Sequence, residues 1–210
     1  DIAPTDGSPD AIAQEFPDVD FLREPENLGF ALANNKAITE YARGEYVLLL
    51  NPDTVVLDGA IDKVVAFAKA NPMARIWGGR TLFGDRRLNP TSCWRRLTLW
   101  NVFCRTAGLT AVFPNSEFFN SEAYGGWDRG TERQVDVVTG CFMLLKRDDW
   151  DEIGVYNLKF RMYGEEVDLC LRAIRDLGAA PRVTPEATII HYGGAAQKFL
   201  SDKMGRLMQA

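Results

Sequence analysis

LLLNPDTVV, residues 48–56, is an apolar run that stops at an Asn-Pro-Asp-Thr segment, residues 51–54, and then resumes. The continuous apolar residues over 45–50 predict a strand that is buried on both faces. In α/β sheets with such strands, ligands collect at the carboxyl ends of the strands. Asp53 is therefore predicted to point into a site. The alternative is that the segment only forms a turn, since all four residue types favour turns.

The rest of the chain alternates short apolar runs with helical patterns. A hydroxyl, a proline and an acid mark a helix start at residue 8. Strands are expected at 19–23, 45–50, 75–83, 135–146 and 187–192, and helices at 30–44, after Asp58 and at 163–178. The expected buried stripes are Ile61, Val64, Val65 and Ala68 on the second of these helices, and Val167, Leu171 and Ile174 on the third. This alternation predicts an α/β fold with a central, mostly parallel sheet covered on both sides.

Length and composition bound the organisation and the partners. A chain of 210 residues with 46% hydrophobic content encloses one sizeable core, so residues 1–210 are expected to form a single domain. The net charge of −5 argues against nucleic acid as a partner. Charge is uneven, however, because residues 75–105 carry seven arginines and a single acid, Asp85, and this local excess suits an anionic partner.

The cysteines and the hydropathy pattern bear on location. The four cysteines lie far apart and show neither metal-site spacing nor the density of a disulfide-stapled domain, which favours a reducing compartment. No apolar run approaches the roughly 20 residues needed to cross a bilayer, and no signal peptide opens the chain. A cytoplasmic location is expected, with peripheral contact at the inner face of the cell membrane.

Two further groups of residues suggest chemistry. Glu165, Glu166 and Asp168 open the last predicted helix, where the helix dipole favours anions, so helix-start electrostatics alone is one explanation. On a helical wheel Glu166 lies nearer the apolar edge than the other two acids and is placed to face a cleft. His191, the only histidine, ends the last predicted strand. It serves either a structural role or a site at that strand's carboxyl end.

Taken in order, these motifs resemble the GT-A-fold glycosyltransferases of family 2, in particular their rhamnosyltransferase-like branch. The segments that carry the resemblance are DIAPTDGS (1–8), PENLGFALANNKAI (25–38), LLLNPDT (48–54), VTGCFMLLKRDDWDEIG (138–154), MYGEEVDLCLR (162–172) and HYGG (191–194). Together they span nearly the whole chain. Each segment alone is a weak signal, whereas the ordered set is specific.

The resemblance implies a role for individual residues. The nucleotide-sugar donor would be bound by Asp1 on the base, by Asn27 and Asn35 in the nucleotide pocket, and by Asn51 and Asp53 at the diphosphate. Asp53 and His191 would hold a divalent metal, Mg²⁺ or Mn²⁺. Glu166 would be the general base, with Glu165 and Asp168 as supporting acids.

The chain departs from the family pattern at three places. The first strand of the fold is absent, so the domain is expected to be incomplete at its N-terminus. Asn51 stands where many relatives have the first acid of an Asp-x-Asp motif, which makes metal binding depend more on Asp53. Glu166 stands where an aspartate is usual, which keeps the carboxylate and extends its reach by one methylene.

The implied reaction moves a sugar, with inversion, from a nucleotide-diphosphate donor to a hydroxyl of a glycan or a polyprenyl-linked acceptor, in cell-surface polysaccharide synthesis. The branch favours dTDP-rhamnose as donor, with UDP- and GDP-sugars as alternatives. A non-catalytic nucleotide- or carbohydrate-binding module that keeps the GT-A fold is the competing class. A phosphatase with an aspartate nucleophile after a buried strand ranks below both, because that chemistry needs an acid where Asn51 stands.

The resemblance is weakest over residues 86–133, which are expected to form an acceptor-side embellishment. Within it, residues 93–105 mix apolar side chains with Arg95, Arg96 and Arg105. This pattern predicts either a basic amphipathic helix that lies on an anionic membrane or an ordinary core-packing helix with solvated arginines.

Overall fold

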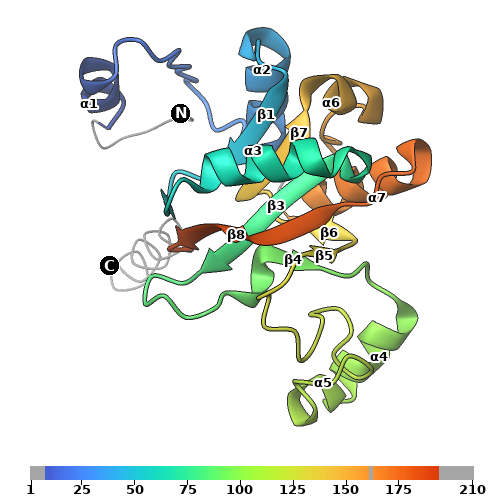
Figure 1. Ribbon diagram of the computed structural model, residues 1–210. Coiled ribbons are helices and arrows are strands. Elements are labelled where there is room, and N and C mark those ends of the chain that lie inside the picture. The colour runs from blue at the N-terminus through green and yellow to red at the C-terminus, as the bar shows by residue number, and fades with distance from the viewer. Residues whose placement is uncertain (1–7, 161–162, 194–210) are drawn as a thin grey trace, which may run out of the picture.

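A single mixed sheet forms the centre of the protein. The computed structural model describes residues 8–160 and 163–193. Its main sheet has the order β1 (Tyr46–Leu50), β7 (Phe142–Lys146), β3 (Ile76–Leu82), β8 (Arg182–His191), β2 (Thr54–Val56), and β5 (Arg133–Gln134) also pairs with β8. A small second sheet joins β4 (Cys93–Trp94) to β6 (Val137–Val138). Figure 1 shows helices in front of and behind the main sheet, which confirms the predicted α/β class.

The prediction of a mostly parallel sheet is wrong for the described residues. Only β3 and β8 pair in parallel, whereas β1–β7, β3–β7, β2–β8 and β5–β8 are antiparallel. The reason is that β7 returns between β1 and β3 in the opposite direction. Even so, β1, β3 and β8 run the same way, so their carboxyl ends share one edge of the sheet.

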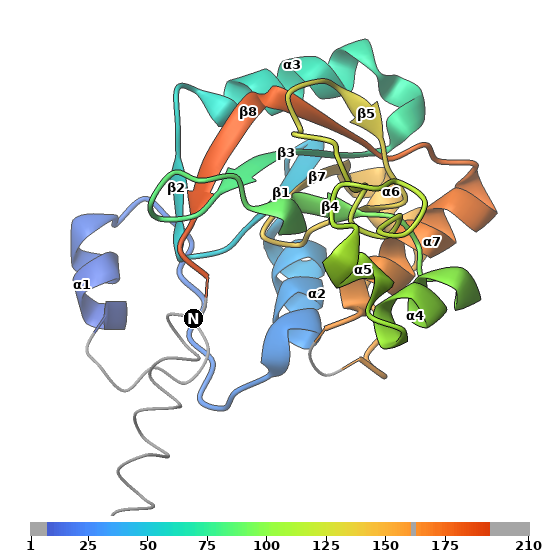
Figure 2. The same ribbon diagram turned by 90° about the horizontal axis from the view of Figure 1, so that it is seen from below.

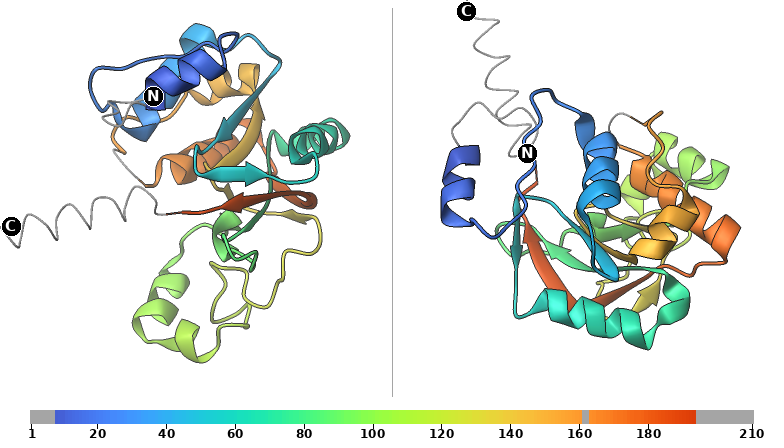
Figure 3. Two further views of the ribbon diagram at one scale, coloured as in Figure 1. Left: turned by 90° about the vertical axis from the view of Figure 1, so that its left-hand side faces the viewer. Right: turned by 90° about the horizontal axis from the view of Figure 1, so that it is seen from above.

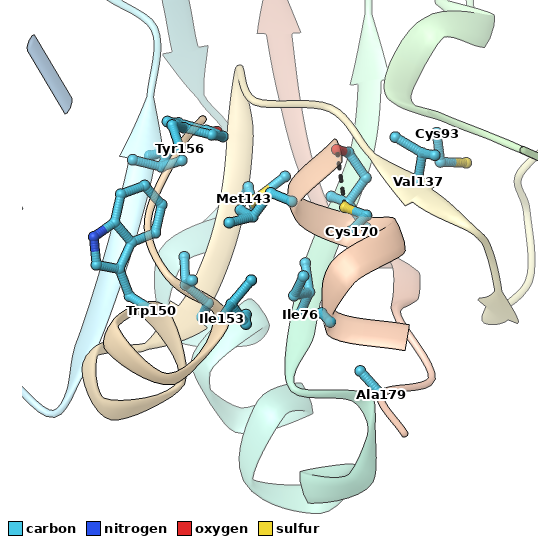
Figure 4. Close-up of a cluster of buried hydrophobic side chains, with 14 of the residues drawn as sticks. Ile76, Cys93, Val137, Met143, Trp150, Ile153, Tyr156, Cys170 and Ala179 are labelled. Atoms are coloured by element: carbon cyan, nitrogen blue, oxygen red, sulfur yellow. Dashed lines mark hydrogen bonds between the residues drawn. The ribbon is translucent and has the colours of Figure 1, made fainter. Parts of the chain in front are cut away.

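Helices cover both faces of this sheet (Figures 2 and 3). On one face lies α3 (Ala60–Ala70), and on the other lie α2 (Gly29–Tyr41), α6 (Arg147–Ile153) and α7 (Glu165–Leu177). β7 serves both layers because successive side chains of a strand point to opposite faces. Its Met143 and Leu145 belong to the core under α6 and α7 (Figure 4), and its Phe142 and Leu144 to the core under α3.

Two predicted helix stripes and one predicted strand are wrong in detail. Ile61 is 38% exposed, and α3 instead buries Ala60, Val64, Phe67 and Ala68. α7 buries Leu169, Cys170 and Ala173 rather than the predicted Val167 stripe, because the face that these residues share is the one that packs beside β6, while Val167 is only partly buried. Residues 19–23 form no strand, since no neighbouring strand pairs with them in the described parts of the chain.

Close approach between β3 and β8 depends on Gly79. The register of the parallel ladder shifts between Gly79 and Arg80. A Cβ atom on Gly79 would lie 2.1 Å from the main-chain oxygen of Ala187. This distance is shorter than any that real Cβ atoms show. The bulge in the central ladder therefore requires a glycine.

We expect Gly79→Ala to lower the free energy of unfolding by about 3 kcal/mol or more, because a backbone atom rather than a flexible side chain must move. Chemical denaturation of the variant and the parent measures this difference. Gly44→Ala is the matched control, since a Cβ there would meet its nearest atom, the oxygen of Tyr46, at 3.3 Å. Similar losses in the two variants would contradict the argument.

The remaining elements lie around the two main cores, and Ala74 of η1 (Pro72–Ala74) belongs to the core under α3. α1 (Ser8–Glu15) precedes the sheet, and the short helices η1 and η2 (Pro90–Ser92) flank β3. α4 (Leu99–Thr106) and α5 (Leu109–Val112) form a lobe that projects away from the sheet (Figures 1 and 3). No helix in the described parts of the chain has both the length and the apolar character needed to cross a membrane.

The predicted helix over 93–105 begins later than expected. Its first residues form β4, and Thr98 then caps α4, with its hydroxyl oxygen accepting a hydrogen bond from the Asn101 amide at 3.2 Å. Arg95 and Arg96 therefore precede the helix. The Arg95 guanidinium lies over the Tyr124 ring, and Arg96 pairs with Asp136.

Candidate active site

The interruption in the opening stretch is a turn that joins two strands of the same sheet. The Asn51 amide donates to the carbonyl of Cys141 at 3.1 Å, and the Thr54 hydroxyl donates to the carbonyl of Asn51 at 2.7 Å. β2 then pairs with β8, with Thr54 opposite His191. The turn and the site are thus one feature, because the turn carries Asp53 to the end of β8.

Asp53 and His191 meet at this edge. Asp53 Oδ1 lies 3.2 Å from His191 Nε2, and the side chains are 26% and 19% exposed. The Asn51 side-chain nitrogen lies 3.5 Å from the same ring atom, and the Tyr192 amide donates to the Asp53 carbonyl at 3.0 Å. The sequence prediction that Asp53 and His191 converge, although 138 residues apart in the numbering, is confirmed.

The donor set at this edge fits a divalent cation that is shared with a substrate. The described residues contain no group of three or more His, Cys, Asp or Glu side chains that could hold a metal by themselves. Mg²⁺ sites commonly use one or two carboxylates, with water and substrate phosphates filling the other positions. One carboxylate and one imidazole, partly open to solvent, match that pattern, and Mn²⁺ accepts the same donors.

The three acids at the start of α7 have three different environments. Glu165 is buried, with 6% exposed, and its Oε2 finds no hydrogen-bond partner among the described residues. Glu166 is half-buried with an equally unpartnered Oε2. Asp168 binds Arg172 Nε at 2.7 Å, and the Arg172 guanidinium also donates to the carbonyls of Ile153 and Val155. The expectation that Glu165 lies away from the apolar side is therefore wrong, because the helix buries a different face.

Burial raises the pKa of the Glu166 carboxyl, and the neighbouring Glu165 carboxylate raises it further, although backbone hydrogen bonds at the helix start act in the opposite direction. The net shift shows that burial outweighs the helix-start effect at Glu166. Simple helix-start electrostatics would have lowered the pKa. A half-buried carboxylate with a raised pKa, and with one oxygen that has no partner among the described residues, is a candidate general base.

Cys141 connects the two parts of the site. Burial raises the pKa of its thiol to about 11, and the carboxylates of Asp53 and Glu166 both contribute to the increase. Cys141 precedes β7, next to the residue that pairs with the end of β1. Both carboxylates therefore act electrostatically on one residue at the shared edge of the sheet.

Tyr156 is a neighbour that the sequence did not single out. Its hydroxyl is buried without a hydrogen-bond partner among the described residues, and burial raises its pKa well above the usual range, with further contributions from Cys170, Glu166 and Glu165. A Cβ on Gly140 would lie 3.5 Å from this hydroxyl. No sequence signal marked Tyr156 as part of a site.

The remaining predicted donor residues do not gather beside Asp53. The Asn35 side chain makes two hydrogen bonds to the main chain of Tyr156. Its nitrogen donates to the Tyr156 carbonyl and its oxygen accepts from the Tyr156 backbone N–H, each at 2.9 Å. Asn27 is exposed and accepts from the Gly29 amide at 2.9 Å, which starts α2. Asn27 thus stabilises the start of α2, and Asn35 stabilises the contact between α2 and Tyr156. Asp1 lies outside the described residues.

An open pocket lies between α2 and the segment 20–28 that precedes it. Phe21, Leu22, Leu28, Asn34 and Lys36 are among its lining residues, and neither Asp53, His191 nor Glu166 lines it. The chemistry of the protein is therefore assigned to the sheet edge rather than to this pocket.

Known proteins resemble the chain in sequence. The profile of glycosyl transferase family 2 matches residues 3–154. Two N-acetylglucosaminyl-diphospho-decaprenol L-rhamnosyltransferases, from the CDC 1551 / Oshkosh and ATCC 25618 / H37Rv strains of Mycobacterium tuberculosis, are each 25% identical over 198 residues, covering 90% of this chain. An uncharacterized protein of Sinorhizobium fredii is 26% identical over 84% of the chain and 18% of its own length. The chain spans 63% of the length of the two rhamnosyltransferases.

Solved structures resemble it in fold. The mannosyltransferase PcManGT from Pyrobaculum calidifontis, in complex with GDP-Man and Mn²⁺, superposes with a TM-score of 0.54 at 19% identity, over 90% of this chain and 45% of that one. GalNAc-T7, with UDP, GalNAc and Mn²⁺, superposes with a TM-score of 0.60 at 13% identity, over 89% of this chain and 34% of that one.

The arrangement of the sheet and helices, together with the two similar solved structures, defines the GT-A fold class. The family profile matches well over half of the residues of the chain, so the chain belongs to glycosyl transferase family 2. The chain is also similar to the two rhamnosyltransferases named above.

Proposed function

We propose that this protein is an inverting, metal-dependent glycosyltransferase that moves a sugar from a nucleotide-diphosphate donor to a hydroxyl of a glycan or polyprenyl-linked acceptor. The observation that carries the proposal is the Asp53–His191 pair at the sheet edge, together with the half-buried Glu166, whose carboxylate acts with that of Asp53 on the Cys141 thiol. Rhamnose, as dTDP-rhamnose, is the favoured sugar, supported by the similarity to two enzymes named as decaprenol-linked rhamnosyltransferases.

Each residue then has a chemical task. Glu166 removes the proton of the acceptor hydroxyl while its oxygen attacks the anomeric carbon. The bond from that carbon to the diphosphate oxygen breaks, the nucleotide diphosphate leaves with the bonding electrons, and attack from the opposite side inverts the anomeric centre. Asp53 and His191 would hold Mg²⁺ or Mn²⁺, which when bound neutralises negative charge on the leaving diphosphate. Asn51 lies beside His191 and is placed to orient its ring.

The raised pKa of Glu166 suits its proposed task. A base is effective when its pKa lies near the working pH, because it is then both ionised and strong enough to accept a proton. Burial moves the carboxyl pKa upward in that direction. The buried Glu166 Oε2 has no hydrogen-bond partner among the described residues, so its capacity to accept a hydrogen bond is unused.

A non-catalytic binding module remains the second candidate, and one observation favours it. Asn51 occupies a position where a second carboxylate would strengthen metal binding, so the described residues offer only two protein ligands at the edge. Such a module would bind nucleotide diphosphates without turnover.

Donor binding and turnover together test the proposal. We expect one nucleotide sugar of a panel containing dTDP-, UDP- and GDP-sugars to raise the melting temperature in the presence of Mn²⁺ and not in EDTA. A ligand at 100 times its dissociation constant stabilises the folded state by about 2.7 kcal/mol, which is readily measured. Release of the nucleotide diphosphate from the stabilising donor should follow. Stabilisation without release supports the binding module, and no stabilisation by any donor contradicts both candidates.

A further inference from the structure

The lobe formed by residues 97–118 carries an unusual concentration of exposed apolar side chains. Eight large apolar side chains in this short segment are exposed, and we refer to them as the apolar patch: Leu97, Leu99, Trp100, Val102, Phe103, Val112, Phe113 and Phe118. Contiguous exposed apolar surfaces of this kind mark sites of interaction rather than ordinary protein surface.

The orientation of α4 is the reverse of that expected for a surface helix. Leu99, Trp100, Val102 and Phe103 occupy one arc of roughly 160° around the helix and are all exposed, with Leu99 91% exposed. The buried positions, Asn101 and Cys104, lie on the opposite arc. An amphipathic helix normally turns its apolar stripe toward the core. Here the core side is secured by polar contacts, since Asn101 Oδ1 accepts a hydrogen bond from the Ser121 hydroxyl at 3.1 Å.

The patch is held in a fixed shape rather than being loose chain. The Trp100 ring lies 4.9 Å from that of Phe118 and 5.5 Å from that of Phe103, measured between centroids. The Trp100 indole also donates to the carbonyl of Phe118 at 2.8 Å. Phe119 connects Phe118 to Phe113, with centroid distances of 5.1 and 4.9 Å. The aromatic rings therefore support one another while their outer faces stay exposed.

The charge around the patch differs from that of the rest of the chain. Residues 86–133 contain seven arginines and four carboxylates, whereas the chain as a whole has a net charge of −5. Arg96 pairs with Asp136, Arg105 with Glu122 and Arg133 with Glu117. Arg95, which lies just before the lobe and is stacked on Tyr124, has no ion pair among the described residues and supplies positive charge beside the patch.

We propose that the apolar patch inserts into the surface of an anionic lipid bilayer and so holds the sheet edge close to the membrane. The patch lies on a projecting lobe (Figures 1 and 3), a shape suited to insertion into a bilayer rather than to enclosing a peptide. Aliphatic residues with a tryptophan, bordered by arginines, form the pattern of interfacial membrane helices. The positive excess complements anionic headgroups. This inference rests on the proposed function for its purpose, which is access to a lipid-linked acceptor.

Vesicle cosedimentation tests the inference without any need for turnover. We expect the protein to bind phosphatidylcholine vesicles that contain phosphatidylglycerol, and to bind more weakly when the anionic lipid is left out or the salt is raised. The double variant Leu99→Glu, Val112→Glu should lower the partition coefficient at least about tenfold, because each apolar side chain withdrawn from the bilayer contributes on the order of tenfold. Both side chains are exposed, so folding should be preserved, and an unchanged melting temperature confirms that.

Met73→Glu is the matched control, since Met73 is 71% exposed on η1, outside the lobe. It should leave vesicle binding unchanged. Equal loss in the control and the double variant, or no binding by the parent, would overturn the inference. So would sedimentation velocity showing that the double variant converts a dimer to a monomer, because the patch would then contact a second copy. If the protein bound vesicles but no nucleotide-sugar donor, the membrane inference would be supported and the proposed glycosyltransferase function would be contradicted.

Discussion

Glu166→Gln is expected to lower sugar transfer by about 10²- to 10⁴-fold while leaving donor affinity nearly unchanged, because it keeps the shape of the side chain and removes the proton acceptor. Glu166→Asp should be milder, since it retains a carboxylate at a shorter reach. Transfer rates at saturating donor, together with donor titrations, measure the two effects separately. Unimpaired transfer by Glu166→Gln would exclude this residue as the base.

The same variant is expected to be more stable than the parent at neutral pH. Burial raises the pKa of Glu166 in the folded protein, so the folded state holds this proton more tightly than the unfolded chain does. That contribution to stability is fully present below the unfolded pKa and is lost as the pH rises through the folded pKa. Neutralising Glu166 should therefore raise the melting temperature above that window and have little effect at lower pH. Helix-start electrostatics predicts the opposite sign, a loss of about 0.3–1 kcal/mol on neutralisation.

Two neighbouring acids provide controls for this experiment. The Glu165 carboxylate raises the pKa of Glu166, so Glu165→Gln should move the acid limb of the rate profile to lower pH. Asp168→Asn removes the carboxylate paired with Arg172 and should lower stability with a smaller loss of rate. Equal rate losses in all three variants would show that the acids act as a structural group, without a distinct base.

The second large effect is expected at Asp53. Asp53→Asn should weaken metal-dependent donor binding by more than about 100-fold, since even loss of an outer partner of a metal ligand commonly costs roughly 10- to 100-fold in affinity. The substitution keeps the size of a side chain that already lies against His191. Calorimetric titration of the stabilising donor with Mn²⁺ and with EDTA gives the metal-dependent part of the affinity.

Asn51→Ala is the companion variant, because Asn51 contacts the same histidine nitrogen as Asp53 but carries no charge. We expect a clearly smaller loss of metal-dependent donor binding. If Asn51→Ala and Asp53→Asn weakened binding equally, the cation would not depend on the Asp53 carboxylate. If neither variant changed the difference in donor affinity between Mn²⁺ and EDTA, the sheet edge would not be the metal site.

The sequence by itself determined the main strands and helices around the site, β1, β3, β7, β8, α2, α3 and α7, and the edge at which the site forms. The apolar run at 46–50 and its polar interruption were sufficient to place Asp53 at a strand end, because buried strands and turn residues leave strong local signals. The ordered motifs predicted the family that the profile match shows. His191 was found because a lone histidine at the end of an apolar strand is conspicuous.

Only the tertiary structure decided how these pieces are oriented. Strand direction is not encoded in local hydrophobicity, so the antiparallel return of β7 was not predictable from periodicity. The helical wheel predicted a stripe with Val167, Leu171 and Ile174 on α7, whereas tertiary packing selected the face that buries Glu165 beside the half-buried Glu166. The apolar residues of α4 give the same periodic signal whether they face a core or solvent. Their exposure was settled by long-range contacts, chiefly Ser121 on Asn101 and Trp100 on Phe118.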